Sequence, residues 1–181
     1  MLIAVAACSA PRGPQVRVID LLAKVSVAEK RPVHGEFHVE EHTFGGQRQA
    51  SLVTPSDSRV TWQMALPRNA TLHTSVAVAG AADADALTFM VAVSDARAFE
   101  PLAQRTVTAA ESARGWVPLS ADMSLYAGRK FSLFYQPDGR QWRIILRVNR
   151  AAGSAERAFW GVPGIDTDVG SAKRFYTRPT R

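Results

Sequence analysis

Three histidines recur at every fourth position, at His34, His38 and His42, and glutamates lie between them. On an α-helix this spacing would place the three imidazoles on one face, where Zn²⁺ or Cu²⁺ could bind. Phe37 and the pair Gly45-Gly46 indicate an extended segment instead, in which residues four apart stand about 13 Å from each other. One metal ion does not reach across that distance, so the pattern favours a solvated strand edge.

A second candidate for metal binding is Asp166-Thr167-Asp168-Val169-Gly170, which resembles the first half of a calcium loop. Two carboxylates two residues apart and a glycine can wrap a hard cation, but the bidentate acid expected further along is missing. Lys173 and Arg174 follow and would repel the ion. A structural calcium at Asp166 and Asp168 is therefore one interpretation, and a plain turn is the other.

The last third of the chain carries a candidate ligand face. Trp142, Arg143, Ile145 and Arg147 fall on one predicted strand. An outward face with Arg143 and Arg147 could hold an anionic sugar or a lipid phosphate through charge-assisted hydrogen bonds. The alternative is a solvated sheet face with Trp142 in the core.

The excess positive charge is concentrated in the same region. Residues 1–128 hold 11 Lys and Arg against 12 Asp and Glu, which is a net charge of −1. Residues 129–181 hold 11 against 4, which is a net charge of +7, so the total of +6 comes from the last third of the chain. Such a surface attracts polyanions. The aromatic patterns of the common RNA-binding modules are absent, so nucleic acid is not expected as a partner.

The sequence carries no motif for nucleophilic catalysis. It has no Gly-x-Ser-x-Gly elbow and no glycine-rich phosphate loop, and its paired acids lie in polar stretches. A hydrolase would require His73 or one of the three spaced histidines to lie beside a serine and an acid, and such triads are recognised in space.

The elements that would position these residues are short strands. Apolar and polar residues alternate with period two in 59–66, 70–79, 86–94 and 141–149, and turn residues fall between these segments. Pro137-Asp138-Gly139 predicts a hairpin between 131–136 and 141–149. Only 17–28 has helical spacing, through Val18, Leu21, Leu22 and Val25. The pattern predicts an all-β sandwich with a short N-terminal helical segment, as one domain over 16–181.

The apolar run at the N-terminus ends in Val5-Ala6-Ala7-Cys8, and these four residues resemble the lipobox of bacterial lipoproteins. The resemblance implies cleavage before Cys8, a diacylglycerol on its thiol and a tether extending to residue 15. Ser9 would then favour the outer membrane over the inner one. No basic residue precedes the run, and the run is shorter than a normal signal peptide core.

The order of the strands is similar to the galactose-binding-like (discoidin-type) jelly-roll sandwich. The residues that carry this resemblance are Arg59-Val60-Thr61-Trp62, Leu66-Pro67-Arg68-Asn69-Ala70-Thr71-Leu72, Leu87-Thr88-Phe89-Met90-Val91-Ala92-Val93, Trp116, Asp122-Met123-Ser124-Leu125-Tyr126-Ala127-Gly128 and Trp160-Gly161-Val162-Pro163. The resemblance implies a non-catalytic, envelope-anchored module that binds a glycan or another anionic envelope polymer. The alternatives are a structural or protein-interaction lipoprotein and the hydrolase named above.

Overall fold

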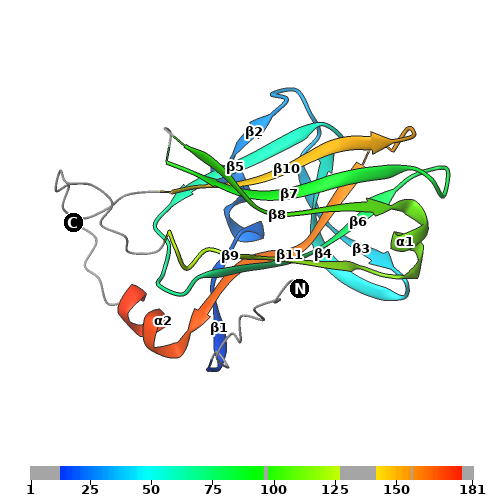
Figure 1. Ribbon diagram of the computed structural model, residues 1–181. Helices are drawn as coiled ribbons and strands as arrows, with labels where there is room; N and C mark the ends of the chain where they lie inside the picture. Colours follow the sequence, from blue (N-terminus) through cyan, green and yellow to red (C-terminus); the bar gives the residue numbers. More distant parts are fainter. Residues whose placement is uncertain (1–12, 96–97, 127–141, 156, 177–181) are drawn as a thin grey trace, which may run out of the picture.

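The computed structural model describes residues 13–95, 98–126, 142–155 and 157–176. Two antiparallel sheets lie face to face across this part of the chain, with α1 and α2 at opposite ends (Figure 1). The expected all-β jelly-roll sandwich is confirmed. The hairpin expected at 137–139 falls outside the described residues.

The six-stranded sheet has the order β3-β4-β11-β6-β9, and β1 pairs with the second half of β11. Its strands are β1 (Gln15–Asp20), β3 (His38–Phe44), β4 (Gln47–Pro55), β6 (Thr71–Ala79), β9 (Val117–Asp122) and β11 (Arg157–Asp168). A bulge between Gly161 and Gly164 divides β11, so β4 pairs before the bulge and β1 after it. One long strand therefore holds three partners together.

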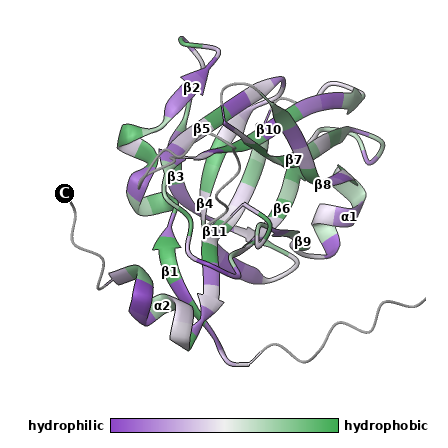
Figure 2. Ribbon diagram, turned by 60° about the vertical axis from the view of Figure 1, so that its left-hand side comes forward, coloured by the Kyte–Doolittle hydropathy of each residue, from purple (hydrophilic) through white to green (hydrophobic). Residues whose placement is uncertain are grey.

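The five-stranded sheet has the order β2-β5-β10-β7-β8. Its strands are β2 (Glu29–Arg31), β5 (Ser58–Met64), β7 (Ala86–Ser94), β8 (Phe99–Thr108) and β10 (Trp142–Ala152). All four segments with period-two alternation are strands, and hydrophilic and hydrophobic bands alternate along them in Figure 2. Alternation places every second side chain on the opposite face, which is why each sheet has an apolar inner face.

The core lies between the two sheets. Trp160 of β11 and Phe89 of β7 are both fully buried, and their rings meet edge to face with centroids 5.0 Å apart. A smaller cluster covers part of the outer face of the six-stranded sheet, and it consists of Phe44, Val53, Ala77, Trp116 and Phe159. The centre of β11 is thus apolar on both faces.

The helices are short. The N-terminal helical segment is confirmed as a 3₁₀ helix over Leu22–Val27, whereas residues 17–20 of the predicted range belong to β1. Pairing of β1 with β11 accounts for that difference, because main-chain hydrogen bonds across the sheet outweigh local helical spacing. The other helices are α1 (Ala109–Arg114) and α2 (Val169–Tyr176). None of the helices in the described ranges has the length and apolar character needed to traverse a bilayer.

Candidate functional site

The predicted ligand residues lie on β10, at the centre of the five-stranded sheet. Arg143 and Arg147 are exposed on its outer face, as expected. Trp142 lies on the opposite face, where it packs against the core and meets Tyr126 edge to face at 5.2 Å. The structure therefore places the two arginines on the same outer face, four residues apart along β10, and the tryptophan on the opposite face.

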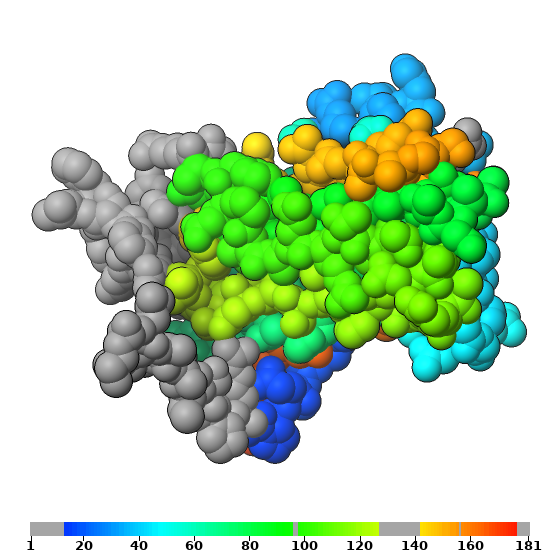
Figure 3. All heavy atoms as spheres, turned by 45° about the vertical axis from the view of Figure 1, so that its right-hand side comes forward, coloured from blue at the N-terminus to red at the C-terminus, as the bar shows by residue number. Residues whose placement is uncertain are grey.

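Strand pairing adds two arginines that the sequence analysis did not single out. Arg147 is paired with Arg59 of β5, and Arg59 is paired with Arg31 of β2. Directly paired residues share a face and have Cβ atoms about 5 Å apart. Arg31, Arg59 and Arg147 thus form a row across three neighbouring strands, which we call the arginine row. Figure 3 shows β10 beside β7 near the upper margin of the molecule, with the light-blue segment around β2 above them.

The charges of the arginine row are only partly balanced. Glu29 accepts a hydrogen bond from Arg31 Nε at 3.2 Å and lies 3.6 Å from Arg59 Nη2. Arg147 donates to the neutral Asn149 at 3.1 Å. In the described strands, Glu29 is the one acid that the register places among these arginines on the outer face. Arg31 and Arg59 keep about half of their side-chain surface exposed, at 57% and 45%.

The same face offers further groups to a ligand. Gln63, Arg143, Ser94 and Phe99 are paired in succession across four strands, and Phe99 is 49% exposed. Beyond the arginine row, the hydroxyls of Thr88 and Thr106 lie 2.8 Å apart. An extended polar molecule laid across the strands would meet guanidinium groups, amides, hydroxyls and one aromatic ring.

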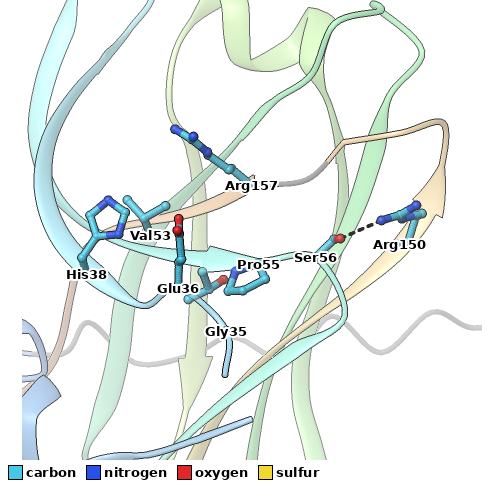
Figure 4. Close-up of a pocket in the computed structure, with 9 residues that line it drawn as sticks. Gly35, Glu36, His38, Val53, Pro55, Ser56, Arg150 and Arg157 are labelled. Atoms are coloured by element: carbon cyan, nitrogen blue, oxygen red, sulfur yellow. Dashed lines mark hydrogen bonds between the residues drawn. The ribbon is translucent and has the colours of Figure 1, made fainter. Parts of the chain in front are cut away.

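A cavity of about 420 Å³ lies where the chain segment before β3 crosses the end of β4. In Figure 4, Glu36, His38 and Arg157 are grouped on one side of it, and Ser56 and Arg150 on the other. Its lining also includes the apolar side chains of Val53 and Pro55.

Of the two guanidinium groups at this cavity, only one is held by the protein in the described structure. Arg150 donates to Ser56 Oγ at 2.9 Å and lies 3.9 Å from a carboxylate oxygen of Asp57. Arg157 is exposed, and no hydrogen bond or ion pair to its side chain is seen within the described ranges. A negative group entering the cavity would therefore find an available partner.

The spaced histidines lie on an extended segment, as predicted. His38 and His42 are on β3, an edge strand, and each imidazole lies 3.4 Å from a different oxygen of Glu40. His34 is exposed in the turn before β3. The ring of His42 also lies against that of Phe159, with centroids 4.4 Å apart and the planes tilted by 38°. Within the residues that the structure describes, no three His, Cys, Asp or Glu side chains gather so as to hold a metal ion.

The two aspartates of the predicted calcium loop have separate protein partners. Asp166 forms an ion pair with Arg17. Asp168 accepts from Asn69 Nδ2 at 2.8 Å and from the backbone amide of Ser171 at 2.9 Å, so it caps the N-terminus of α2. The hydrogen bonds from Asn69 and Ser171 lower the pKa of Asp168 to about 2. The calcium site itself stays a prediction.

No histidine is joined to a serine by a hydrogen bond in the part of the chain that the structure describes. Ser51, which is paired with Glu40, donates its hydroxyl to the Glu40 carbonyl at 3.1 Å. The hydrolase interpretation thus gains no support from these contacts. Cys8 lies outside the described residues.

No family model and no curated protein matches the sequence. Solved structures do resemble the fold. The module CBM51-2 of ZmpB from Clostridium perfringens, solved with INT domains and GlcNAc, has a TM-score of 0.53 and 13% identity, and the match covers 77% of this chain and 29% of that one. The same module without GlcNAc gives a TM-score of 0.52 and 14% identity over 77% and 29% of the two chains.

A further structure is the C-terminal family 22 carbohydrate-binding module of Xyn10B from Clostridium thermocellum. It has a TM-score of 0.48 and 12% identity over 85% of this chain and 94% of that one. This chain spans less than a third of the length of the two ZmpB chains. At such identities the likeness concerns the fold alone. This chain has a β-sandwich fold like that of the ZmpB carbohydrate-binding module.

Proposed function

We propose that this protein is a non-catalytic binding module for an anionic glycan or another anionic envelope polymer. The observation that carries the proposal is the arginine row, in which the exposed side chains of Arg31, Arg59 and Arg147 lie side by side on the outer sheet face. The ZmpB module of similar fold was solved in complex with GlcNAc, which supports a sugar as the ligand class.

The chemistry of the face favours an extended anionic chain. Guanidinium groups form bidentate, charge-assisted hydrogen bonds with carboxylate or sulfate groups. Successive strands are about 4.8 Å apart, so the row presents its charges at regular intervals. Arg143 extends the positive face along β10, and Phe99 offers a ring for an apolar sugar face.

The test compares the affinity of the full chain for polygalacturonate with that of the double variant Arg59→Gln, Arg147→Gln. We expect the double variant to lose at least about tenfold, because it removes two charge-assisted contacts. Arg48→Gln on β4 is the matched control, since Arg48 is 71% exposed on the other sheet and pairs with Glu41. That variant should lose less than about twofold.

Salt and a second polyanion complete the experiment. Retention of polygalacturonate should weaken as sodium chloride rises, because exposed charges are screened. Equal retention of polyglutamate would show a general anion surface and would contradict the glycan part of the proposal. Absence of retention at low salt, or equal binding by the double variant, would contradict the assignment of this face. Capture of an envelope protein in place of any polymer would favour the protein-interaction alternative.

We also propose that Cys8 carries the lipid that anchors the module to a bacterial envelope. The support is the lipobox-like Val5-Ala6-Ala7-Cys8 followed by residues suited to a tether. A lipid adds about 0.8 kcal/mol of membrane affinity per buried methylene. The protein expressed in bacteria should therefore fractionate with membranes, and Cys8→Ser should release it. Mass spectrometry that finds an unmodified Cys8 would contradict the anchor.

A further inference from the structure

The cavity beside Arg157 and the arginine row lie near the same end of the sandwich, but they are formed by different residues. Arg150 follows Arg147 by three residues on β10, and its backbone amide donates to Asp57 in the turn after β4 at 2.9 Å. The cavity opens beyond that turn, between Glu36 and Arg157. The residues that line it differ from those of the arginine row (Figure 4).

We propose that this cavity binds a single sugar residue that carries a carboxylate, such as a terminal uronic acid. Its volume of about 420 Å³ falls within the range of small-molecule sites. This site goes beyond the proposed function, because the arginine row can bind a polymer whether or not the cavity is occupied.

The carboxylate is assigned to Arg157. Its guanidinium has no hydrogen-bond or ion-pair partner in the described part of the protein, whereas Arg150 is engaged by Ser56 and Asp57. Arg157 can form two parallel N–H···O bonds with a carboxylate, which a neutral sugar does not offer. The fixed guanidinium of Arg150 adds positive potential at the far side of the cavity.

The remainder of the sugar is matched by the other lining groups. Glu36 accepts hydrogen bonds from sugar hydroxyls, and His38 can either donate or accept. The pyrrolidine ring of Pro55, which is partly exposed, provides an apolar contact for the C–H face of the ring. Glu36 would repel a second carboxylate, so a residue with one acidic group suits the cavity better than a diacid.

The experiment measures binding of glucuronate and of glucose to the full chain by ligand-observed NMR and calorimetry. Glucuronate should bind, and glucose should bind at least about tenfold more weakly, because it lacks the group that Arg157 recognises. Arg157→Gln should reduce glucuronate binding to the level of glucose. Glu36→Gln should weaken both sugars, since it removes a hydroxyl acceptor.

The controls separate this site from the arginine row. Arg147→Gln should leave glucuronate affinity unchanged, and Arg157→Gln should leave polygalacturonate retention within about twofold. Circular dichroism of each variant establishes that it folds. The proposal is wrong if glucuronate fails to bind, if glucose binds equally well, or if Arg157→Gln has no effect. Displacement of glucuronate by an equal concentration of acetate would also contradict it, because the sugar ring would then contribute nothing.

Discussion

Asp85 connects two turns that are distant in the sequence. Its side chain is buried and accepts hydrogen bonds from the backbone amides of Ser154 at 2.8 Å and Ala82 at 3.1 Å. Gly153 has φ of +70°, and a Cβ there would lie 1.9 Å from the carboxylate. A single carboxylate thus fixes both the β6–β7 and the β10–β11 connections.

The ionisation of Asp85 should matter for stability. The amides of Ser154 and Ala82 lower its pKa, because they stabilise the charged form. A lowered pKa in the folded state contributes stability above the unfolded value of about 3.9, and this is lost as the pH falls through the folded pKa. We expect Asp85→Asn to lower the melting temperature at pH 7, and the difference from the wild type to shrink as the pH falls below about 4.

Thermal unfolding followed by circular dichroism from pH 7 to pH 2 checks this expectation. Asp83→Asn is the matched control, since Asp83 is exposed two residues away in the same turn. A constant difference between Asp85→Asn and the wild type across the whole pH range would contradict the role of ionisation.

At the scale of elements, four strands were predicted from the alternation of residues that face the core and residues that face solvent, although β9, which alternates in the same way, was not. β5, β6, β7 and β10 all alternate in this way, and the segment containing His38 and His42 was correctly expected to be extended. β11 was missed for a physical reason. The core covers Trp160 on its inner face, and the aromatic cluster covers Phe159 on its outer face, so no alternation is visible.

The candidate site was predictable only in part, because the local sequence of a strand does not determine which residues of other strands it pairs with. Arg143 and Arg147 were found through their alternation on one strand. Arg31 and Arg59 belong to the part of the chain with balanced charge, and only pairing with β10 through β5 brings them beside Arg147. The cavity was missed altogether, since Glu36 and Arg157 are 121 positions apart in the sequence and meet only in the folded chain.

At the scale of the whole molecule, the two proposed binding surfaces depend on one shared core. The arginine row lies on the outer face of the five-stranded sheet. The cavity is lined by the segment before β3, by residues of β3, β4 and β11 of the other sheet, and by Ser56 and Arg150. Contacts between the inner faces hold these surfaces in a fixed relation. A core substitution should therefore affect both surfaces together, whereas the surface variants proposed above should affect one each.

Trp160 offers the sharpest test of that dependence. It is fully buried on β11 and meets Phe89 of the opposite sheet edge to face, with an interplanar angle of 82°. Replacing it with alanine removes a large apolar side chain and leaves a cavity between the sheets. We expect Trp160→Ala to lower the free energy of unfolding by about 3–5 kcal/mol. Urea denaturation followed by circular dichroism measures this value.

Hydrogen exchange then shows whether the sheets respond as one unit. In Trp160→Ala, protection should fall by a similar factor in the amides of β4 and of β10, although only β11 carries the substitution. Phe99→Ala is the control, because Phe99 is 49% exposed on the outer face and should change stability by less than about 0.5 kcal/mol. Loss of protection confined to the six-stranded sheet would mean that the two layers unfold separately. In that case the polymer surface on the other layer would tolerate damage to the core.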